Sequence, residues 1–139
     1  MKKVILSVFL LLSVLVACSS GSGSDSIAID DVIDKFNEEG LEAEDVTEMT
    51  KDDYGMAPMK AEEAKRFLIP SLGEDSGGRI FSYDNQKDLN EMKEYYDSLG
   101  EESAMFFSWT ADHENILIQI NGELSEEKYE EYKAALESM

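Results

Sequence analysis

Hydrophobic residues recur at helical spacing in three separate segments of this chain. Each stripe repeats every three or four positions, which places its members on one face of a helix. The stripes are Ile29, Val32, Ile33 and Phe36; Leu89, Met92, Tyr96 and Leu99; and Tyr129, Tyr132, Leu136 and Met139. Gly40 and Gly100 would end the first two helices, Asp84 or Asn85 would begin the second, and Ser125 would cap the third. The pattern therefore predicts three main helices, the first over residues 27–39.

Alternating apolar and polar residues predict the strands. The clearest pair has Met105, Phe107 and Trp109 on one face of its first strand and Ile116, Ile118 and Ile120 alternating in its second. Arg79–Tyr83 would form a strand after a glycine-rich loop, and its residues Ile80–Tyr83 could pair with Phe67–Ile69 across that loop. A further strand is expected around Asp45–Thr50, a loop over 51–58 and a short helix over 60–66.

The resulting element order is helix, strand, short helix, strand pair, helix, strand pair, helix. Strands joined by short connections imply a mainly antiparallel sheet of about five strands. Amphipathic helices of this kind would pack on one face of the sheet, which makes the fold class α+β. Residues 26–139 are the length of one domain, and we expect them to form a single α+β domain.

The first 25 residues differ in composition from the rest. Met1–Lys3 is positively charged, Val4–Val16 is apolar apart from two serines, and Leu15-Val16-Ala17-Cys18 ends the run. The apolar run is shorter than the roughly 20 residues that a membrane-spanning helix needs. Its basic start and small-residue end are typical of an export signal. The serine- and glycine-rich stretch after Cys18 predicts a flexible tether.

The residues Leu15-Val16-Ala17-Cys18 resemble the lipobox of bacterial lipoproteins. The resemblance implies that residues 1–17 are a signal peptide and that residues 18–25 carry a lipidated Cys18 and a tether. Acyl chains such as palmitate would anchor the protein in membrane lipid, on the extracytoplasmic face of the cell membrane. The blocks 67–73 and 116–122 also resemble small lipoproteins of bacilli without assigned activity.

The chain is strongly acidic, with a formal net charge of −19. Cleavage before Cys18 would remove Lys2 and Lys3 and bring the side-chain charge to −21. Such a body is repelled by nucleic acid and by anionic headgroups. We therefore expect no nucleic-acid partner and a domain that stands off the membrane on its tether.

The sequence offers no catalytic or metal-ligand constellation. His113 is the only histidine, whereas a zinc site needs about three protein ligands. The acidic clusters lack the spacing of a calcium loop, and residues 73–79 lack the ending of a phosphate loop. We expect no cofactor, no metal and no enzyme activity. A hydrolase with an unrecognised carboxylate site stays an alternative, since any two of the many acids could converge.

Three residues are candidates for contact with a partner. Arg79 follows the glycine-rich loop and could face a partner's carboxylate or one of the chain's own acids. Phe106 would lie exposed or under a loop if helices cover only one sheet face, and Trp109 is the other aromatic candidate; core packing is the competing interpretation for both.

The function we expect is that of a non-enzymatic protein-interaction module held at the membrane. Its partner would be a membrane or cell-surface protein, because the tether gives even a weak contact a high local concentration. By analogy of size and anchor, an exclusion or immunity-type surface protein belongs to this class. A small-ligand-binding lipoprotein is the alternative, and it would need a sizeable apolar cavity.

Overall fold

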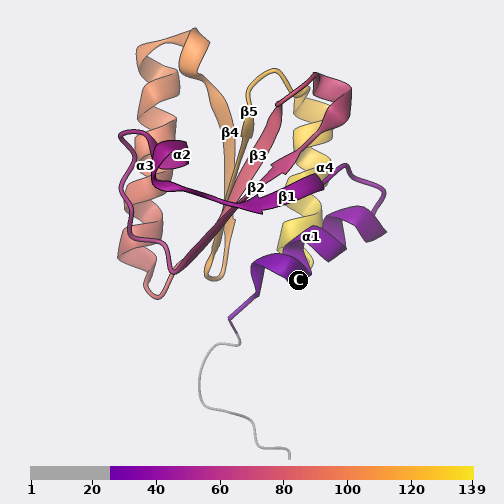
Figure 1. Cartoon of the computed structure of the whole chain (residues 1–139), viewed down its shortest axis with the longest axis horizontal. Coiled ribbons are helices and arrows are strands. Elements are labelled where there is room, and N and C mark those ends of the chain that lie inside the picture. Colours follow the sequence, from indigo (N-terminus) through magenta and orange to yellow (C-terminus); the bar gives the residue numbers. More distant parts are fainter. Residues whose placement is uncertain (1–25) are drawn as a thin grey trace, which may run out of the picture.

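The computed structural model describes residues 26–139, which form a five-stranded antiparallel sheet with flanking helices (Figure 1). The elements are α1 (Ile29–Glu38), β1 (Glu44–Glu48), α2 (Lys51–Tyr54), β2 (Glu63–Leu68), β3 (Gly77–Ser82), α3 (Gln86–Glu102), β4 (Ser108–His113), β5 (Ile116–Asn121) and α4 (Glu126–Glu137). The strands lie in the order β1-β2-β3-β5-β4, and every neighbouring pair is antiparallel. The α+β fold class expected from the sequence is confirmed.

The helices lie on both faces of the sheet, whereas the sequence pattern predicted one covered face (Figure 1). Helices α1 and α4 cover one core, to which β5 contributes its three isoleucines. Helix α3 and Tyr54 of α2 cover a second core, which contains Phe81, Tyr83 and Leu117. Strand β5 is therefore buried on both faces from Ile116 to Ile120. A continuous apolar run is typical of such a strand, and it hides the alternation that distinguishes one face from the other.

The first core is organised around Phe36 of α1. Its ring packs edge-on against Tyr132 of α4 at 5.0 Å and tilted against Phe67 of β2 at 6.0 Å between centroids. Helix α1 ends as the sequence predicted: Gly40 has φ +76°, and the amide of Leu41 donates to the Phe36 carbonyl oxygen at 2.8 Å. This glycine-centred ending turns Leu41 back into the core, where it is buried.

Two expectations near the first strand were wrong. Residues Lys51–Tyr54 form a helical turn and not a loop, because Thr50 and Asp53 make a capping box in which the Thr50 amide donates to Asp53 at 2.7 Å. Residues 63–68 form a strand and not a short helix. Their hydrogen-bonded ladders to β1 and β3 outweigh the helical preference of the alanines and charged residues.

The remaining corrections concern α3, its connection to β4, and α4. Helix α3 runs through Gly100 to Glu102, so Gly100 does not end it. Strand β4 begins only at Ser108, because Ala104–Phe106 form a 3₁₀ turn. Met139 lies beyond the end of α4 and is exposed, although the stripe predicted it buried.

Candidate binding pocket

One row of residues across the sheet is entirely polar on the face that carries α3. It consists of Thr47, Arg66, Arg79, Gln119 and Thr110, which are register partners on five successive strands. The neighbouring row on the same face contains Phe81 and Leu117, which α3 covers. The polar row therefore marks the position where the second core ends.

The two arginines of the chain are neighbours in this row. Arg66 donates from Nη1 to Asp53 at 3.0 Å, so its charge is neutralised by the turn of α2. Hydrogen bonds from Thr50, with a smaller contribution from Arg66, hold the pKa of the Asp53 carboxyl below its usual value. The ion pair is therefore fully charged at neutral pH.

Arg79 has a different environment from Arg66. Its Nη1 donates to Oε1 of Gln119 at 2.9 Å, and Gln119 is itself buried. Although the chain has 31 acidic residues, none within residues 26–139 lies within 4.0 Å of the Arg79 guanidinium. Its positive charge is held in place by a neutral amide, without an ion-paired carboxylate from the described part of the chain.

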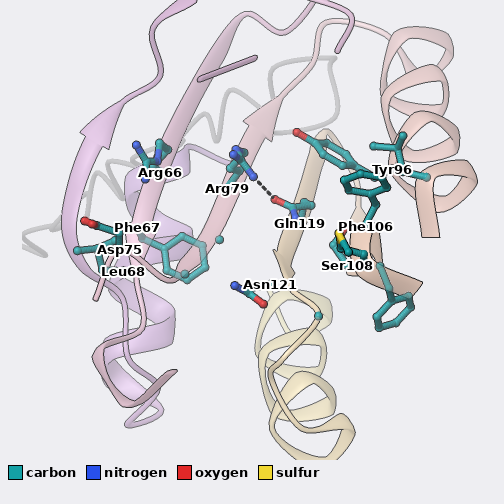
Figure 2. A pocket seen from close by; sticks show the side chains of 16 residues that line it. Arg66, Phe67, Leu68, Asp75, Arg79, Tyr96, Phe106, Ser108, Gln119 and Asn121 are labelled. Atoms are coloured by element: carbon teal, nitrogen blue, oxygen red, sulfur yellow. Dashed lines mark hydrogen bonds between the residues drawn. The ribbon is translucent and has the colours of Figure 1, made fainter. Parts of the chain in front are cut away.

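A pocket of about 340 Å³ lies over this row, and we call it the arginine pocket. Figure 2 shows Arg66, Arg79 and Gln119 side by side in it, with Asn121 below them and with Phe106 and Ser108 on the other side. Tyr96 and Leu99 of α3 line the helix side, and Asp75 lies at the loop before β3. Its volume lies within the range of small-ligand sites.

Exposed apolar residues border the arginine pocket. Met105, Phe106 and Phe107, which we call the apolar rim, are 85%, 58% and 41% exposed. The rim is nevertheless held in a definite position, because Phe107 packs edge-on against Trp109 at 4.9 Å. A Cβ atom at Gly122 would lie 2.3 Å from the Phe107 carbonyl oxygen, so only glycine fits beneath it.

Two polar atoms of the pocket residues are buried without a hydrogen-bond partner among residues 26–139. They are Nε of Arg79 and Oγ of Ser108, a residue that is only 8% exposed. Leaving such a group unpaired costs about 1–3 kcal/mol. Native proteins keep few such groups, and those they keep often serve a function. A third atom of this kind, the Tyr83 hydroxyl, belongs to the second core, where burial raises its pKa.

The structure brings two of the three predicted contact residues together. Arg79 and Phe106, from β3 and the 3₁₀ turn, line the same pocket. Trp109 faces the opposite side of the sheet, where it stacks on Tyr129 at 4.6 Å and its indole nitrogen donates to the Leu124 carbonyl oxygen at 2.8 Å. Cys18 lies outside the described residues.

Sequence reasoning missed Arg66, Ser108 and Gln119. Their association depends on the register of four strands, which no local pattern specifies. The one signal in the sequence was Gln119, a polar residue inside the apolar run 116–120.

His113 ends β4 and is half-buried, and within residues 26–139 no group of three His, Cys, Asp or Glu side chains is arranged to hold a metal ion. None of the helices in that same part of the chain is long and apolar enough to cross a membrane. Comparison of the chain with protein-family models, with curated proteins and with solved structures found no match.

Proposed function

We propose that this chain is a lipid-anchored recognition protein that binds a protein partner, without catalysis, at the extracytoplasmic face of the cell membrane. The observation that carries the proposal is the apolar rim beside the guanidinium of Arg79, which pairs with Gln119 and with no carboxylate of residues 26–139. Aromatic and arginine side chains supply a large share of binding energy at protein interfaces. Here both kinds line one pocket.

The rim supports binding because it is already ordered. Phe107 is seated between Gly100 and Gly122, so the neighbouring Phe106 is presented to solvent from a fixed backbone. A preorganised surface loses little conformational entropy on association. The exposed side chains of Met105 and Phe106 can therefore contribute most of their burial energy to a complex.

The lipid anchor would compensate for the small area of this binding surface. Acylation of Cys18 would confine the protein to the membrane and raise its effective concentration near partners there. The acidic domain, repelled by anionic headgroups, would stand off the bilayer on residues 18–25. A tethered module of this kind fits an exclusion or immunity-type surface protein.

Crosslinking in living cells, followed by mass spectrometry, tests this proposal. The wild-type chain should capture a membrane or cell-surface protein, and Phe106→Ser and Cys18→Ala should each lose it. Met56→Ser is the matched control, because Met56 is 92% exposed but lies outside the arginine pocket. Equal capture by wild type and Phe106→Ser would contradict the role of the rim, and equal capture by Cys18→Ala would contradict the role of the anchor.

A small-ligand-binding function is the second candidate, and the volume of the arginine pocket favours it. The polar floor of that pocket differs from the apolar cavity that the sequence led us to expect for a carrier. Native mass spectrometry of the intact protein distinguishes the two functions, because a carrier would release a small molecule of constant mass.

A further inference from the structure

We infer that the arginine pocket binds one carboxylate group attached to an apolar moiety, as at the C-terminus of a polypeptide that ends in an apolar residue. This inference rests on the proposed function, since it identifies the part of the partner that the pocket would recognise.

The charge of the pocket selects a single negative charge. Arg66 is neutralised by Asp53, whereas Arg79 has no carboxylate within 4.0 Å among residues 26–139. Asp75 also lines the pocket but lies within 4.0 Å of neither arginine, so the Arg79 guanidinium, unpaired with any carboxylate of residues 26–139, is left for the ligand. A multiply charged anion would also be opposed by the net charge of −19 on the whole chain. A lone carboxylate meets both conditions.

The donors in the pocket suit a carboxylate. Gln119 occupies Nη1 of Arg79, which leaves the edge formed by Nε and Nη2 for a paired interaction with two carboxylate oxygens. Nε is buried and has no partner among residues 26–139, so the paired interaction forms only if the Arg79 side chain moves toward the ligand. Ser108 and Asn121, register partners one row further along, add a hydroxyl and an amide at the same pocket.

The walls of the pocket suit an apolar group next to that carboxylate. Phe106, which is largely exposed, lies on the side opposite Arg66 (Figure 2), and Leu99 of α3 also lines the pocket. A terminal apolar side chain could lie against them while its carboxylate faces Arg79. Capture of a terminal carboxylate is an established mode of peptide recognition.

Calorimetric titration of the full chain, extracted in mild detergent, tests the inference. The probes are acetyl-Ala-Ala-Phe with a free carboxylate, the same peptide as its amide, and 3-phenylpropanoate as a free small carboxylate. The acid peptide should bind saturably and at least about tenfold more tightly than the amide, because the amide lacks the charge. Comparable affinity for acid and amide, or no saturable binding of the acid, would overturn the inference.

Variants connect the binding to Arg79. Arg79→Gln should weaken binding of the acid peptide about 10- to 100-fold. Arg79→Lys keeps the charge but lacks the planar guanidinium that binds two carboxylate oxygens at once, so it should also weaken binding. Arg66→Gln combined with Asp53→Asn removes the neighbouring ion pair without changing the net charge and should have a much smaller effect. A loss in that double variant equal to the loss in Arg79→Gln would overturn the specific role of Arg79.

The outcomes distinguish a peptide ligand from a free small molecule, and they distinguish failure of this inference from failure of the proposed function. If 3-phenylpropanoate binds as tightly as the peptide, the carboxylate chemistry is supported and its source is a free small molecule. If capture of a partner is lost in Phe106→Ser but unchanged in Arg79→Gln, this inference is overturned and the proposed function stands. If no Phe106-dependent partner exists, the proposed function fails, and the titration alone decides about the pocket.

Discussion

Replacing Ser108 by alanine should weaken carboxylate binding while leaving the domain at least as stable as the wild type. The Ser108 hydroxyl is buried and has no partner among residues 26–139, so it destabilises the empty domain by about 1–3 kcal/mol. Alanine removes it and leaves a gap of roughly 15 Å³, which costs about 0.4 kcal/mol at about 24 cal/mol per Å³. The expected balance is a gain of roughly 0.5–2.5 kcal/mol.

Thr110→Val is the matched control on the same strand and the same face. The Thr110 hydroxyl donates a hydrogen bond to Asp97 at 2.6 Å in an exposed position. Valine therefore removes an existing hydrogen bond, whereas Ser108→Ala removes a hydroxyl that has none among residues 26–139. A net loss of about 0.5–1.5 kcal/mol is expected. The two substitutions should therefore shift the free energy of unfolding in opposite directions.

Urea denaturation followed by tryptophan fluorescence measures both effects. Trp109 is the single tryptophan and stacks on Tyr129, so unfolding changes its surroundings. With an m-value of about 1–3 kcal/mol per molar urea, a change of 1 kcal/mol moves the midpoint by about 0.3–1 M. A Ser108→Ala midpoint below that of the wild type would refute the reasoning, because it would mean that the hydroxyl already has a stabilising partner in the free protein.

Two other predictions concern stability alone. Phe36→Ala should reduce the free energy of unfolding by about 3–5 kcal/mol, because the ring is fully buried between Phe67 and Tyr132; a loss below about 1 kcal/mol in urea denaturation would contradict that packing. Burial raises the pKa of the Tyr83, Tyr96 and Tyr132 phenols above the ordinary value of 10.0. The unfolded chain therefore loses these protons first, so stability should be level up to about pH 10 and fall above it. Urea midpoints measured from about pH 8 to 12 check this, and a midpoint that stays level to about pH 12 would contradict it.

Local features of the fold could be predicted because they depend on residues a few positions apart. Gly40 ends α1 with a left-handed conformation, and Asn85 caps α3 by accepting from the Asp88 amide at 2.9 Å. The β4–β5 hairpin also followed from alternation and its short turn, whereas for β2 only the pairing of Phe67 and Leu68 across the glycine-rich loop was predicted and residues 63–66 were not. Each of these features is decided by backbone sterics or by hydrogen bonds within one segment.

The second face of the sheet could not be predicted in the same way. Leu117 and Ile118 are both buried because α3 covers one face of the sheet and α4 covers the other. Which face a helix covers is set by the topology of the whole domain. A short apolar run has the same composition whether one or both faces are covered. The prediction that β4 starts at Met105 was wrong for a related reason. Phe107 packs against Gly100 and Gly122, and these tertiary contacts cannot be inferred from the alternation within the segment.

The sequence by itself determined the fold class, the glycine that ends α1, the start of α3 and α4, and the acidic charge, because composition and local spacing carry that information. Only the tertiary structure decided that Arg66, Arg79 and Gln119 form one row, that no carboxylate of residues 26–139 lies within 4.0 Å of Arg79, and that Phe106 shares its pocket. These residues lie on different strands and a 3₁₀ turn, and the register of the sheet brings them together. A shift of one residue in that register would turn the row to the opposite face.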